Sequence, residues 1–287
     1  MKRVLVAGAT GYLGGHVVAE LQRRGVWVRA LARRPEQAQT LAGADDVFIG
    51  QVTDPATLGG VAGGVDAVFS CVGITKPKDR AGYDQVDYAG NLALLREAER
   101  SGAGQFCYIA LHNGAQLRDT IALAAAKERF VDVLRASDVR STIVRPTGFF
   151  SDMTEFANMA ARGRIFLIGD GSTRINPISG RDLASASLDA IADGTAELDI
   201  GGPQVLTYQE IADLAAKAAA KPCRITPLPV SLLRGTVAVM RRTTPQRIWG
   251  PLQFFATIMT MDMVAPPHGT DDLASFFGAP PRDARPA

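Results

Sequence analysis

Short, uninterrupted apolar runs recur along the first half of the chain, with helical patterns between them. The runs that predict strands cover residues 4–7, 26–31, 47–49, 67–70, 106–109 and 142–144. Because these runs are apolar throughout rather than alternating, they fit strands covered on both faces, as in a parallel sheet. Helical spacing of apolar positions is found over 12–24, 84–100 and 119–136. This alternation predicts an α/β fold with a doubly wound parallel Rossmann sheet.

The second half of the chain is organised differently. We predict a Rossmann domain over residues 1–150 and a smaller region over 151–287. The two are expected to interleave, because residues 199–202 form a predicted strand that returns toward the main sheet. Thr207 and Glu210 have the spacing of a helix capping box. Most of the large apolar side chains here are expected in the core, and some are expected to line a pocket for a flat, apolar substrate. These side chains are Phe156, Met159, Phe166, Trp249, Phe254, Phe255 and Met259.

Composition and charge narrow the possible functions. The chain has 287 residues, of which 47% are hydrophobic and 21% charged, and a formal net charge of +2. This balance gives no indication of a nucleic-acid partner. Cys71, Cys107 and Cys223 lack metal-ligand spacing, so we expect no metal and a reduced, cytoplasmic setting.

One apolar stretch, residues 248–261, bears on membranes and partners. It is shorter than the roughly 20 residues that span a bilayer. We therefore expect a buried helix there and no transmembrane segment, with a peripheral membrane contact left open. We expect a monomer or a homodimer.

The first predicted strand runs directly into a glycine-rich turn with the pattern G-x-x-G-x-x-G. A Cβ atom at Gly8 would crowd the tight turn, and one at Gly11 would block the approach of a pyrophosphate. Gly14 allows the next helix to pack closely, and the N-terminus of that helix presents N–H groups to phosphates. Because the turn lies between a strand and a helix, it predicts a dinucleotide site rather than a structural turn. The predicted contacts are Gly8, Thr10, Gly11, Tyr12, Leu13 and Gly14.

The end of the second predicted strand indicates which nucleotide is bound. It carries Arg33 and Arg34 where NAD enzymes place an acid for the ribose 2′-hydroxyl. A guanidinium can hold a 2′-phosphate with two hydrogen bonds, and Arg33 is the stronger candidate. We therefore expect NADP(H) in preference to NAD(H). A solvated surface pair is the alternative.

Two later strand ends extend the predicted cofactor site. Thr53 and Asp54 follow the third strand, and Asp54 could accept a hydrogen bond from the adenine amino group. N-capping of the next helix explains Asp54 equally well. Cys71-Val72-Gly73 follows the fourth strand, where the glycine would admit the ribose and nicotinamide; a plain turn is the alternative.

Several stretches resemble the extended, atypical branch of the short-chain dehydrogenase/reductase superfamily. They are the glycine turn, Thr53-Asp54, Cys71-Val72-Gly73, Ala126-Lys127-Glu128 and Val144-Arg145-Pro146-Thr147-Gly148-Phe149-Phe150. Three more are similar to the NmrA-like and isoflavone-reductase-like proteins: Gly169-Asp170-Gly171, Asn176-Pro177-Ile178 and Asp182-Leu183-Ala184. Residues 265–273 resemble the tail of divinyl chlorophyllide 8-vinyl reductases.

The resemblance implies roles for particular residues. Lys127 would hydrogen-bond the nicotinamide ribose, and its charge could stabilise negative charge on the substrate. The alternative places Lys127 on the solvent face of a helix, paired with acids. After the sixth strand, Pro146, Gly148 and Phe149 would border the cofactor.

The chain departs from the superfamily at the two residues that usually assist carbonyl reduction. Ala110 occupies the serine position and cannot hold a carbonyl oxygen. Leu123 occupies the tyrosine position and has no proton to donate. The atypical branch also lacks the tyrosine, so hydride transfer is not excluded. His112, on the loop after the fifth strand, is the candidate catalytic acid, since an ordinary histidine pKa of about 6.5 suits that role. An exposed, inert histidine is the alternative, Tyr83 is a weaker donor, and water is a third source.

These features together predict an NADPH-dependent reductase of the atypical short-chain type, an enzyme that transfers hydride to a small or medium-sized apolar carbonyl, enone or activated alkene. One alternative is a non-catalytic NADP(H)-sensing regulatory protein of the NmrA type, which the missing serine and tyrosine favour. Another is an assembly factor for a membrane redox complex, which residues 248–261 would contact.

Overall fold

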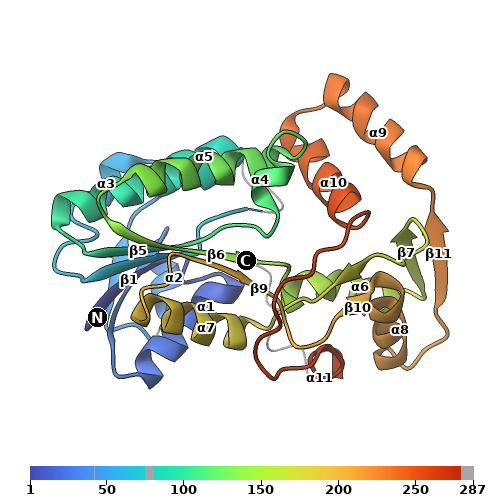
Figure 1. Cartoon of the computed structure of the whole chain (residues 1–287), viewed down its shortest axis with the longest axis horizontal. Helices are drawn as coiled ribbons and strands as arrows, with labels where there is room; N and C mark the ends of the chain where they lie inside the picture. Colours follow the sequence, from blue (N-terminus) through green and yellow to red (C-terminus); the bar gives the residue numbers. More distant parts are fainter. Residues whose placement is uncertain (42, 75–80, 279–287) are drawn as a thin grey trace. The chain divides into compact units, whose positions relative to one another are not determined.

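The computed structural model describes residues 1–41, 43–74 and 81–278. Its central element is a seven-stranded sheet in the order β3-β2-β1-β4-β5-β6-β9 (Figure 1). The strands are β1 (Arg3–Ala7), β2 (Trp27–Ala32), β3 (Asp46–Ile49), β4 (Ala67–Ser70), β5 (Gln105–Ile109), β6 (Arg140–Pro146) and β9 (Glu197–Ile200). Neighbouring strands from β3 to β6 pair in parallel. The predicted doubly wound Rossmann sheet is therefore confirmed, and the strand order reverses between β1 and β4, where such sheets bind ligands.

Helices cover both faces of this sheet. Figure 1 shows α3 (Asn91–Ser101) and α5 (Ala122–Ala136) on one face and α1 (Tyr12–Arg23) and α7 (Gly180–Ala192) on the other. On the α5 side, the ring of Phe130 packs against that of Phe106, with 5.8 Å between the centroids, and both are fully buried. Cover on both faces explains why the strand segments are apolar throughout.

Two predicted helices differ from the observed ones at their starts. The helix predicted over 84–100 begins as a π-helix, η3 (Asp84–Gly90), which continues directly into α3. The helix predicted over 119–136 begins only at Ala122. The prediction was wrong for its first three residues because Ile121 is extended (φ −118°) and buries its β-branched side chain.

The chain divides into two compact units. The first comprises Met1–Arg145 and Leu183–Leu198 and contains most of the main sheet. Among the described residues, the second comprises Pro146–Asp182 and residues 199–278. The predicted return strand is present as β9, which lies next to β6 in the sheet order.

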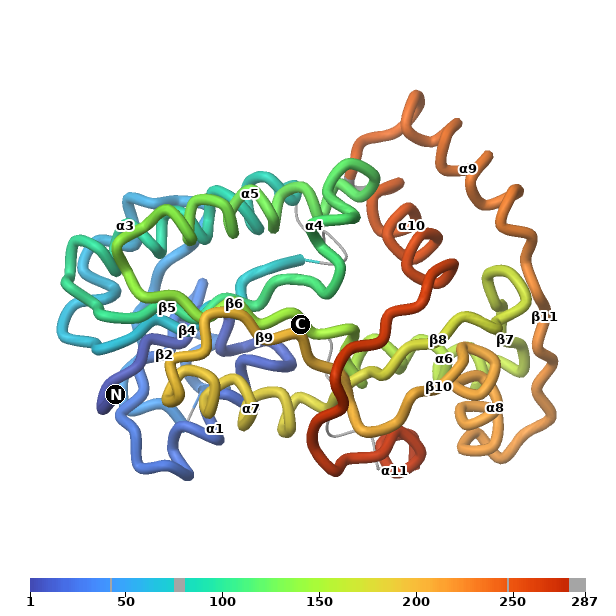
Figure 2. Tube along the Cα trace, viewed as in Figure 1, coloured from blue at the N-terminus to red at the C-terminus, as the bar shows by residue number. Residues whose placement is uncertain are grey.

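The second unit is built from short sheets and helices (Figure 2). Its elements are α6 (Phe150–Ala161), β7 (Arg164–Ile168), β8 (Arg174–Ile175), β10 (Leu206–Thr207), α8 (Tyr208–Ala218), β11 (Arg224–Leu228), α9 (Val230–Thr243), α10 (Gln246–Ile258) and α11 (Leu273–Gly278). The rings of Phe156 on α6 and Tyr208 on α8 stack with centroids 6.2 Å apart. The predicted capping box is confirmed, since the Glu210 N–H donates to Thr207 Oγ1 at 3.1 Å.

The large apolar side chains of this unit are only partly in its core. Phe156, Phe254 and Met259 are buried, whereas Met159, Trp249 and Phe255 are half-buried. Phe166 is not in the core; it lies on the two-stranded β7–β11 sheet and is 41% exposed. The expectation of a buried helix over 248–261 is wrong at one end, because the first turn of α10 precedes the buried positions and leaves Ile248 47% exposed. None of the helices in the described residues is long and apolar enough to cross a membrane.

Candidate nucleotide-binding and catalytic site

The glycine turn joins β1 to α1 in a conformation that side chains would obstruct. Gly8 has φ +82°, a region that residues with a Cβ rarely adopt. The Gly11 N–H donates to Gly8 O at 2.9 Å and closes the turn. A Cβ on Gly14 would lie 2.0 Å from the same oxygen, so α1 approaches the turn closely only because residue 14 is glycine.

The N-terminus of α1 suits an anion. Gly11 occupies the N-cap position and has no side chain to bond the first N–H groups, and the first turn of α1 contains no acidic residue. The positive end of the helix dipole therefore faces the glycine turn without a competing carboxylate from its own first turn. This arrangement fits a pyrophosphate group.

Arg33 and Arg34 follow β2 directly, and both are exposed. Their backbone N–H groups donate to Gln37 Oε1 at 3.1 and 3.2 Å, which fixes the backbone where the strand ends. Recognition of a 2′-phosphate by Arg33 stays a prediction.

Thr53 and Asp54 are exposed residues that precede η2 (Pro55–Leu58). Asp54 is the N-cap residue of η2, but its side chain makes no capping hydrogen bond. The capping alternative for Asp54 is therefore wrong, and its contact with adenine stays a prediction.

The loop after β4 is tied to α3 by a buried asparagine within the helix predicted over 84–100, to which the sequence analysis gave no role. Asn91 is fully buried, and its Oδ1 accepts a hydrogen bond from Ser70 Oγ at 2.5 Å. Its Nδ2 donates to Val72 O at 3.2 Å and to Asp87 O at 2.9 Å. One side chain thus holds the Cys71-Val72-Gly73 stretch against the π-helix.

Lys127 lies at the carboxyl end of the sheet and points away from bulk solvent. Its side chain is 12% exposed, and Nζ donates to Ile109 O, at the end of β5, at 3.1 Å. Nζ also lies 3.3 Å from Asp87 Oδ1, and Asp87 is fully buried. The alternative of a solvent-facing Lys127 is therefore wrong, although the residue does pair with an acid. A Cβ on Gly73 would lie 2.9 Å from Nζ, so the glycine leaves room for the ammonium group.

Asp87 is the buried charge that the sequence analysis missed. Burial raises the pKa of its carboxyl from the ordinary value to about 6, and the nearby Lys127 ammonium partly opposes this rise. Oδ2 accepts a hydrogen bond from the Ile74 N–H at 3.3 Å, whereas Oδ1 has no hydrogen-bond partner among the described residues. Asp87 lies within the π-helix η3, and such segments are frequent at functional sites. The only signal in the sequence was an acid within an amphipathic helix pattern.

The residues that bear on proton transfer differ in their burial. Ala110 and Leu123, at the usual serine and tyrosine positions, are both buried. His112 is half-buried, on the loop between β5 and α4 (Gly114–Leu117). Tyr83 is fully buried, and burial together with Asp87 raises the pKa of its phenol well above the ordinary value. Tyr83 is therefore a poor proton donor.

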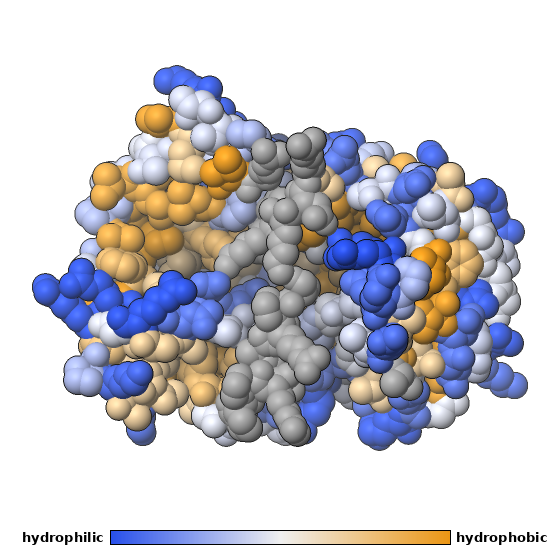
Figure 3. Space-filling view, turned by 180° about the vertical axis from the view of Figure 1, so that it is seen from behind, coloured by the Kyte–Doolittle hydropathy of each residue, from blue (hydrophilic) through white to orange (hydrophobic). Residues whose placement is uncertain are grey.

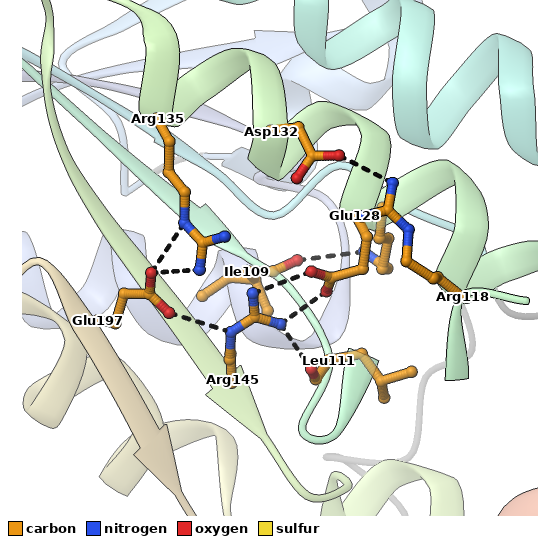
Figure 4. A network of polar contacts seen from close by, with 9 residues as sticks. Ile109, Leu111, Arg118, Glu128, Asp132, Arg135, Arg145 and Glu197 are labelled. Atoms are coloured by element: carbon orange, nitrogen blue, oxygen red, sulfur yellow. Dashed lines mark hydrogen bonds and ion pairs between the residues drawn. The ribbon is translucent and has the colours of Figure 1, made fainter. Parts of the chain in front are cut away.

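A second buried ion pair fixes α5, the helix that carries Lys127 (Figure 4). The Arg145 guanidinium donates to both carboxylate oxygens of Glu128, at 2.6 and 3.0 Å, and to Leu111 O at 3.1 Å. The two side chains are only 7% and 1% exposed. Arg145 Nε also lies 3.5 Å from Glu197 Oε2, and Glu197 in turn accepts from Arg135 Nε at 2.9 Å. Side chains from β6, α5 and β9 thus lock the helix to the sheet one residue away from Lys127.

The remaining predicted cofactor contacts lie in the second unit. Gly148 O accepts a hydrogen bond from the Ile178 N–H at 2.9 Å. Phe149 is the N-cap residue of α6, and its N–H donates to Asp152 Oδ2 at 3.1 Å. Pro146 ends β6. Their contact with a cofactor stays a prediction.

Comparison with known proteins identifies the family. Residues 8–194 match a protein family described as NAD(P)H-binding, which is more than half of the chain. The chain belongs to this NAD(P)H-binding family. The glycine turn, the N-terminus of α1 and the strand ends around Gly73 all lie inside the matched range, and the family is an oxidoreductase family with a Rossmann-type fold.

Relatives with several different names match most of the chain. Divinyl chlorophyllide a 8-vinyl-reductase of Zea mays is 31% identical over 264 residues, covering 83% of this chain and 64% of the relative. NAD(P)H azoreductase of Xenophilus azovorans is 27% identical, covering 77% of this chain and 75% of the relative. Photosystem II assembly factor Ycf39 of Trieres chinensis is 26% identical, covering 80% and 73%. The chain therefore spans somewhat less than two thirds of the length of the vinyl reductases that it matches.

Known structures show the same fold over nearly the whole chain. The NADPH-dependent quinone oxidoreductase QOR2 of Escherichia coli, in complex with NADPH, has a TM-score of 0.74 at 19% identity and covers 96% of this chain and 98% of its own. The triphenylmethane reductase of Citrobacter sp., in complex with NADP(H), has a TM-score of 0.72 at 19% identity and covers 98% of each chain. The resemblance inferred from the motifs is confirmed.

Proposed function

We propose that the protein is an NADPH-dependent reductase that transfers hydride to an apolar carbonyl, enone or activated alkene. The observation that carries this proposal is the position of Lys127, whose ammonium group is held between Asp87 and Ile109 O beside Gly73. Lysine is rarely buried, because removing its charge from water costs free energy. A lysine side chain that is only 12% exposed, beside a buried carboxyl with a raised pKa at the carboxyl ends of parallel strands, is typical of a functional site.

The residues of the first unit fit the parts of the dinucleotide. The glycine turn and the N-terminus of α1 would hold the pyrophosphate, and Arg33 would hold the 2′-phosphate. When bound, the nicotinamide supplies the hydride. Lys127 would donate to the ribose hydroxyls beside the nicotinamide, and its positive charge would favour negative charge that develops on the substrate oxygen or carbon.

Asp87 would act on Lys127 rather than on the substrate. Its Oδ1 contact and the Ile109 carbonyl restrain the ammonium from two sides, so Lys127 is positioned before any ligand arrives. Because Ala110 and Leu123 cannot supply a proton, two sources remain, namely His112 and water.

The first experiment separates nucleotide binding from turnover. NADPH and NADH binding would be measured by calorimetry for the wild type, Arg33→Ala and Arg34→Ala. We expect Arg33→Ala to weaken NADPH binding at least tenfold and to leave NADH binding nearly unchanged, because only NADPH carries the 2′-phosphate. Equal loss for both nucleotides, or no loss for either, contradicts the role of Arg33.

Turnover would then be assayed as NADPH oxidation over enones, quinones, azo dyes and divinyl chlorophyllide. Lys127→Met should reduce kcat at least a hundredfold, whereas Lys217→Met, which changes an exposed lysine on α8, should leave it unchanged. If His112 supplies the proton, His112→Ala lowers kcat and removes one limb of its pH profile; an unchanged profile assigns the proton to water.

A second candidate is a sensor that binds NADP(H) without turnover, and the buried Ala110 and Leu123 at the usual catalytic positions favour it. Tight NADPH binding with no oxidation on any substrate of the panel supports the sensor and refutes the reductase.

A further inference from the structure

Positive charge is concentrated in one stretch of the second unit. Residues 214–261 contain seven basic residues and no aspartate or glutamate, so all 29 acidic residues of the chain lie outside this stretch. The basic residues are Lys217, Lys221, Arg224, Arg234, Arg241, Arg242 and Arg247. The near-neutral net charge of +2 therefore hides a local excess of positive charge. This stretch contains all of α9 and α10.

Helix α9 has an apolar side that no other part of the described chain covers. It packs mainly on α10, and Val237 is its single buried residue. Leu232 and Val239 are 63% and 61% exposed. They are seven residues apart, so they lie on the same face of the helix with Gly235 and Thr236 between them. Two large aliphatic side chains are therefore exposed to solvent on one face of α9.

The same face forms an open groove of about 800 Å³. It is lined by Pro229 and by residues of α9 between Ser231 and Met240, without any charged side chain among the lining residues. Figure 3 shows hydrophobic side chains gathered along the part of the surface formed by α9, with hydrophilic side chains at one end of this helix.

Three arginines lie on α9: Arg242 flanks the apolar face, whereas Arg234 and Arg241 lie on the opposite side of the helix by its period. Arg234, Arg241 and Arg242 are all exposed, and none of them pairs with a carboxylate in the described part of the chain. The Arg241 guanidinium lies 5.1 Å from the centroid of the Trp249 ring, in the first turn of α10. Long basic side chains and a half-buried tryptophan beside exposed aliphatic groups have the composition of a helix that lies in a membrane interface.

We propose that the exposed face of α9 docks on an anionic lipid bilayer. Leu232 and Val239 enter the boundary between headgroups and acyl chains, and Arg242, at the flank of the face, contacts the anionic headgroups. Arg234 and Arg241 point away from the bilayer and add attraction at longer range. A second copy of the chain is a poorer occupant, because a symmetric dimer through this face would bring two acid-free, basic surfaces together. Nucleic acid is also a poorer occupant, since its phosphates would leave the aliphatic side chains without apolar partners. This docking is independent of the reductase activity proposed above.

The test uses the full chain and vesicles of defined composition. Co-sedimentation would be measured with phosphatidylcholine vesicles that contain about 30% phosphatidylglycerol and with phosphatidylcholine vesicles alone, at about 0.1 M and about 1 M salt. We expect at least tenfold stronger partitioning onto the anionic vesicles, and loss of that difference at the higher salt, where charges are screened. The double variant Leu232→Glu, Val239→Glu should weaken binding at least tenfold.

The control variant for the double substitution is Val205→Glu. Val205→Glu places the same charge on an apolar residue that is 46% exposed outside the basic stretch, and it should bind vesicles like the wild type. A thermal melt of each variant shows that it is folded. The proposal is overturned if the wild type does not bind anionic vesicles, if it binds neutral vesicles equally well, or if the double variant binds as the wild type does. A dimer in solution that the double variant dissociates, without vesicle binding, assigns the face to a second copy instead.

Discussion

Replacing Asp87 with asparagine should change how the stability of the protein depends on pH. Burial raises the pKa of the Asp87 carboxyl from its ordinary value to about 6 in the folded protein. The folded state then binds this proton more tightly than the unfolded state does. The stability associated with Asp87 is therefore fully present below the ordinary pKa of about 4, and it is lost as the pH rises through about 6.

The size of the effect follows from the difference between the two pKa values. A pKa near 6 in place of one near 4 corresponds to about 3 kcal/mol in the free energy of unfolding. Linkage places about 2 kcal/mol of this change between about pH 4.5 and about pH 7.5. Asparagine has nearly the same shape but does not ionise, so the Asp87→Asn variant lacks this part of the pH dependence.

The assay is urea unfolding of the wild type and of Asp87→Asn at about pH 4.5, 6 and 7.5. The difference between their free energies of unfolding isolates Asp87, because the other titrating groups are common to both proteins. We expect the wild type to lose about 2 kcal/mol relative to the variant across this range. A difference that does not change with pH refutes the reasoning. A wild type that gains stability relative to the variant as the pH rises shows that Lys127 outweighs burial.

Asp66→Asn is a control of opposite sign. The backbone N–H groups of Lys2 and Arg3 donate to the Asp66 carboxylate and lower its pKa. Stability from Asp66 is therefore present above its ordinary pKa and is lost as the pH falls. The wild type should gain stability over Asp66→Asn as the pH rises, which also shows that the assay resolves the direction of a single carboxyl.

The glycine turn and the second buried ion pair give two more outcomes for the same unfolding assay. Gly14→Ala places a methyl group 2.0 Å from a backbone oxygen and should cost about 3 kcal/mol, whereas Gly15→Ala meets nothing within 4 Å and should stabilise the helix by about 0.5 kcal/mol or more. A similar result for the two glycines contradicts the packing argument. Glu128→Gln removes the closest and most buried charged partner of the Arg145 guanidinium, which is 7% exposed, and leaves the more exposed Glu197 at 3.5 Å; it should cost about 3 kcal/mol. Asp132 lies on the same helix, and its ion pair with Arg118 is exposed: the Arg118 and Asp132 side chains are 36% and 49% exposed. Asp132→Asn should therefore cost less than about 1 kcal/mol. Equal losses of stability for Glu128→Gln and Asp132→Asn would show that burial does not control how much an ion pair contributes to stability.

The residues changed in these experiments shape the predicted nucleotide site or hold Lys127 in place. The glycine turn forms one wall of the predicted nucleotide site, and the Glu128–Arg145 pair fixes the helix that carries Lys127. Asp87 then restrains the ammonium group itself. If Asp87→Asn keeps NADPH affinity but lowers kcat, the carboxyl positions Lys127 for turnover rather than for binding.

The sequence by itself determined the fold class and the place of the nucleotide turn. Uniform apolar runs separated by helical patterns are local features, and so is the steric requirement for glycine at residues 8 and 14. The six predicted strands of the first half are all present within a few residues of their expected bounds. Helix starts were predicted less well, as at Ile121, because the burial of a single β-branched side chain decided them.

Only the tertiary structure decided which polar residues meet. Asp87 and Lys127 are far apart in the chain and come together because η3 packs against α5. Asn91 was visible only as a position on a helix, although it bonds Ser70 and the loop that follows. The exposure of Leu232 and Val239 was equally hidden, because an apolar residue on a helix is a core residue only if another element covers it. Contacts between distant segments depend on packing, and periodicity along the chain does not encode them.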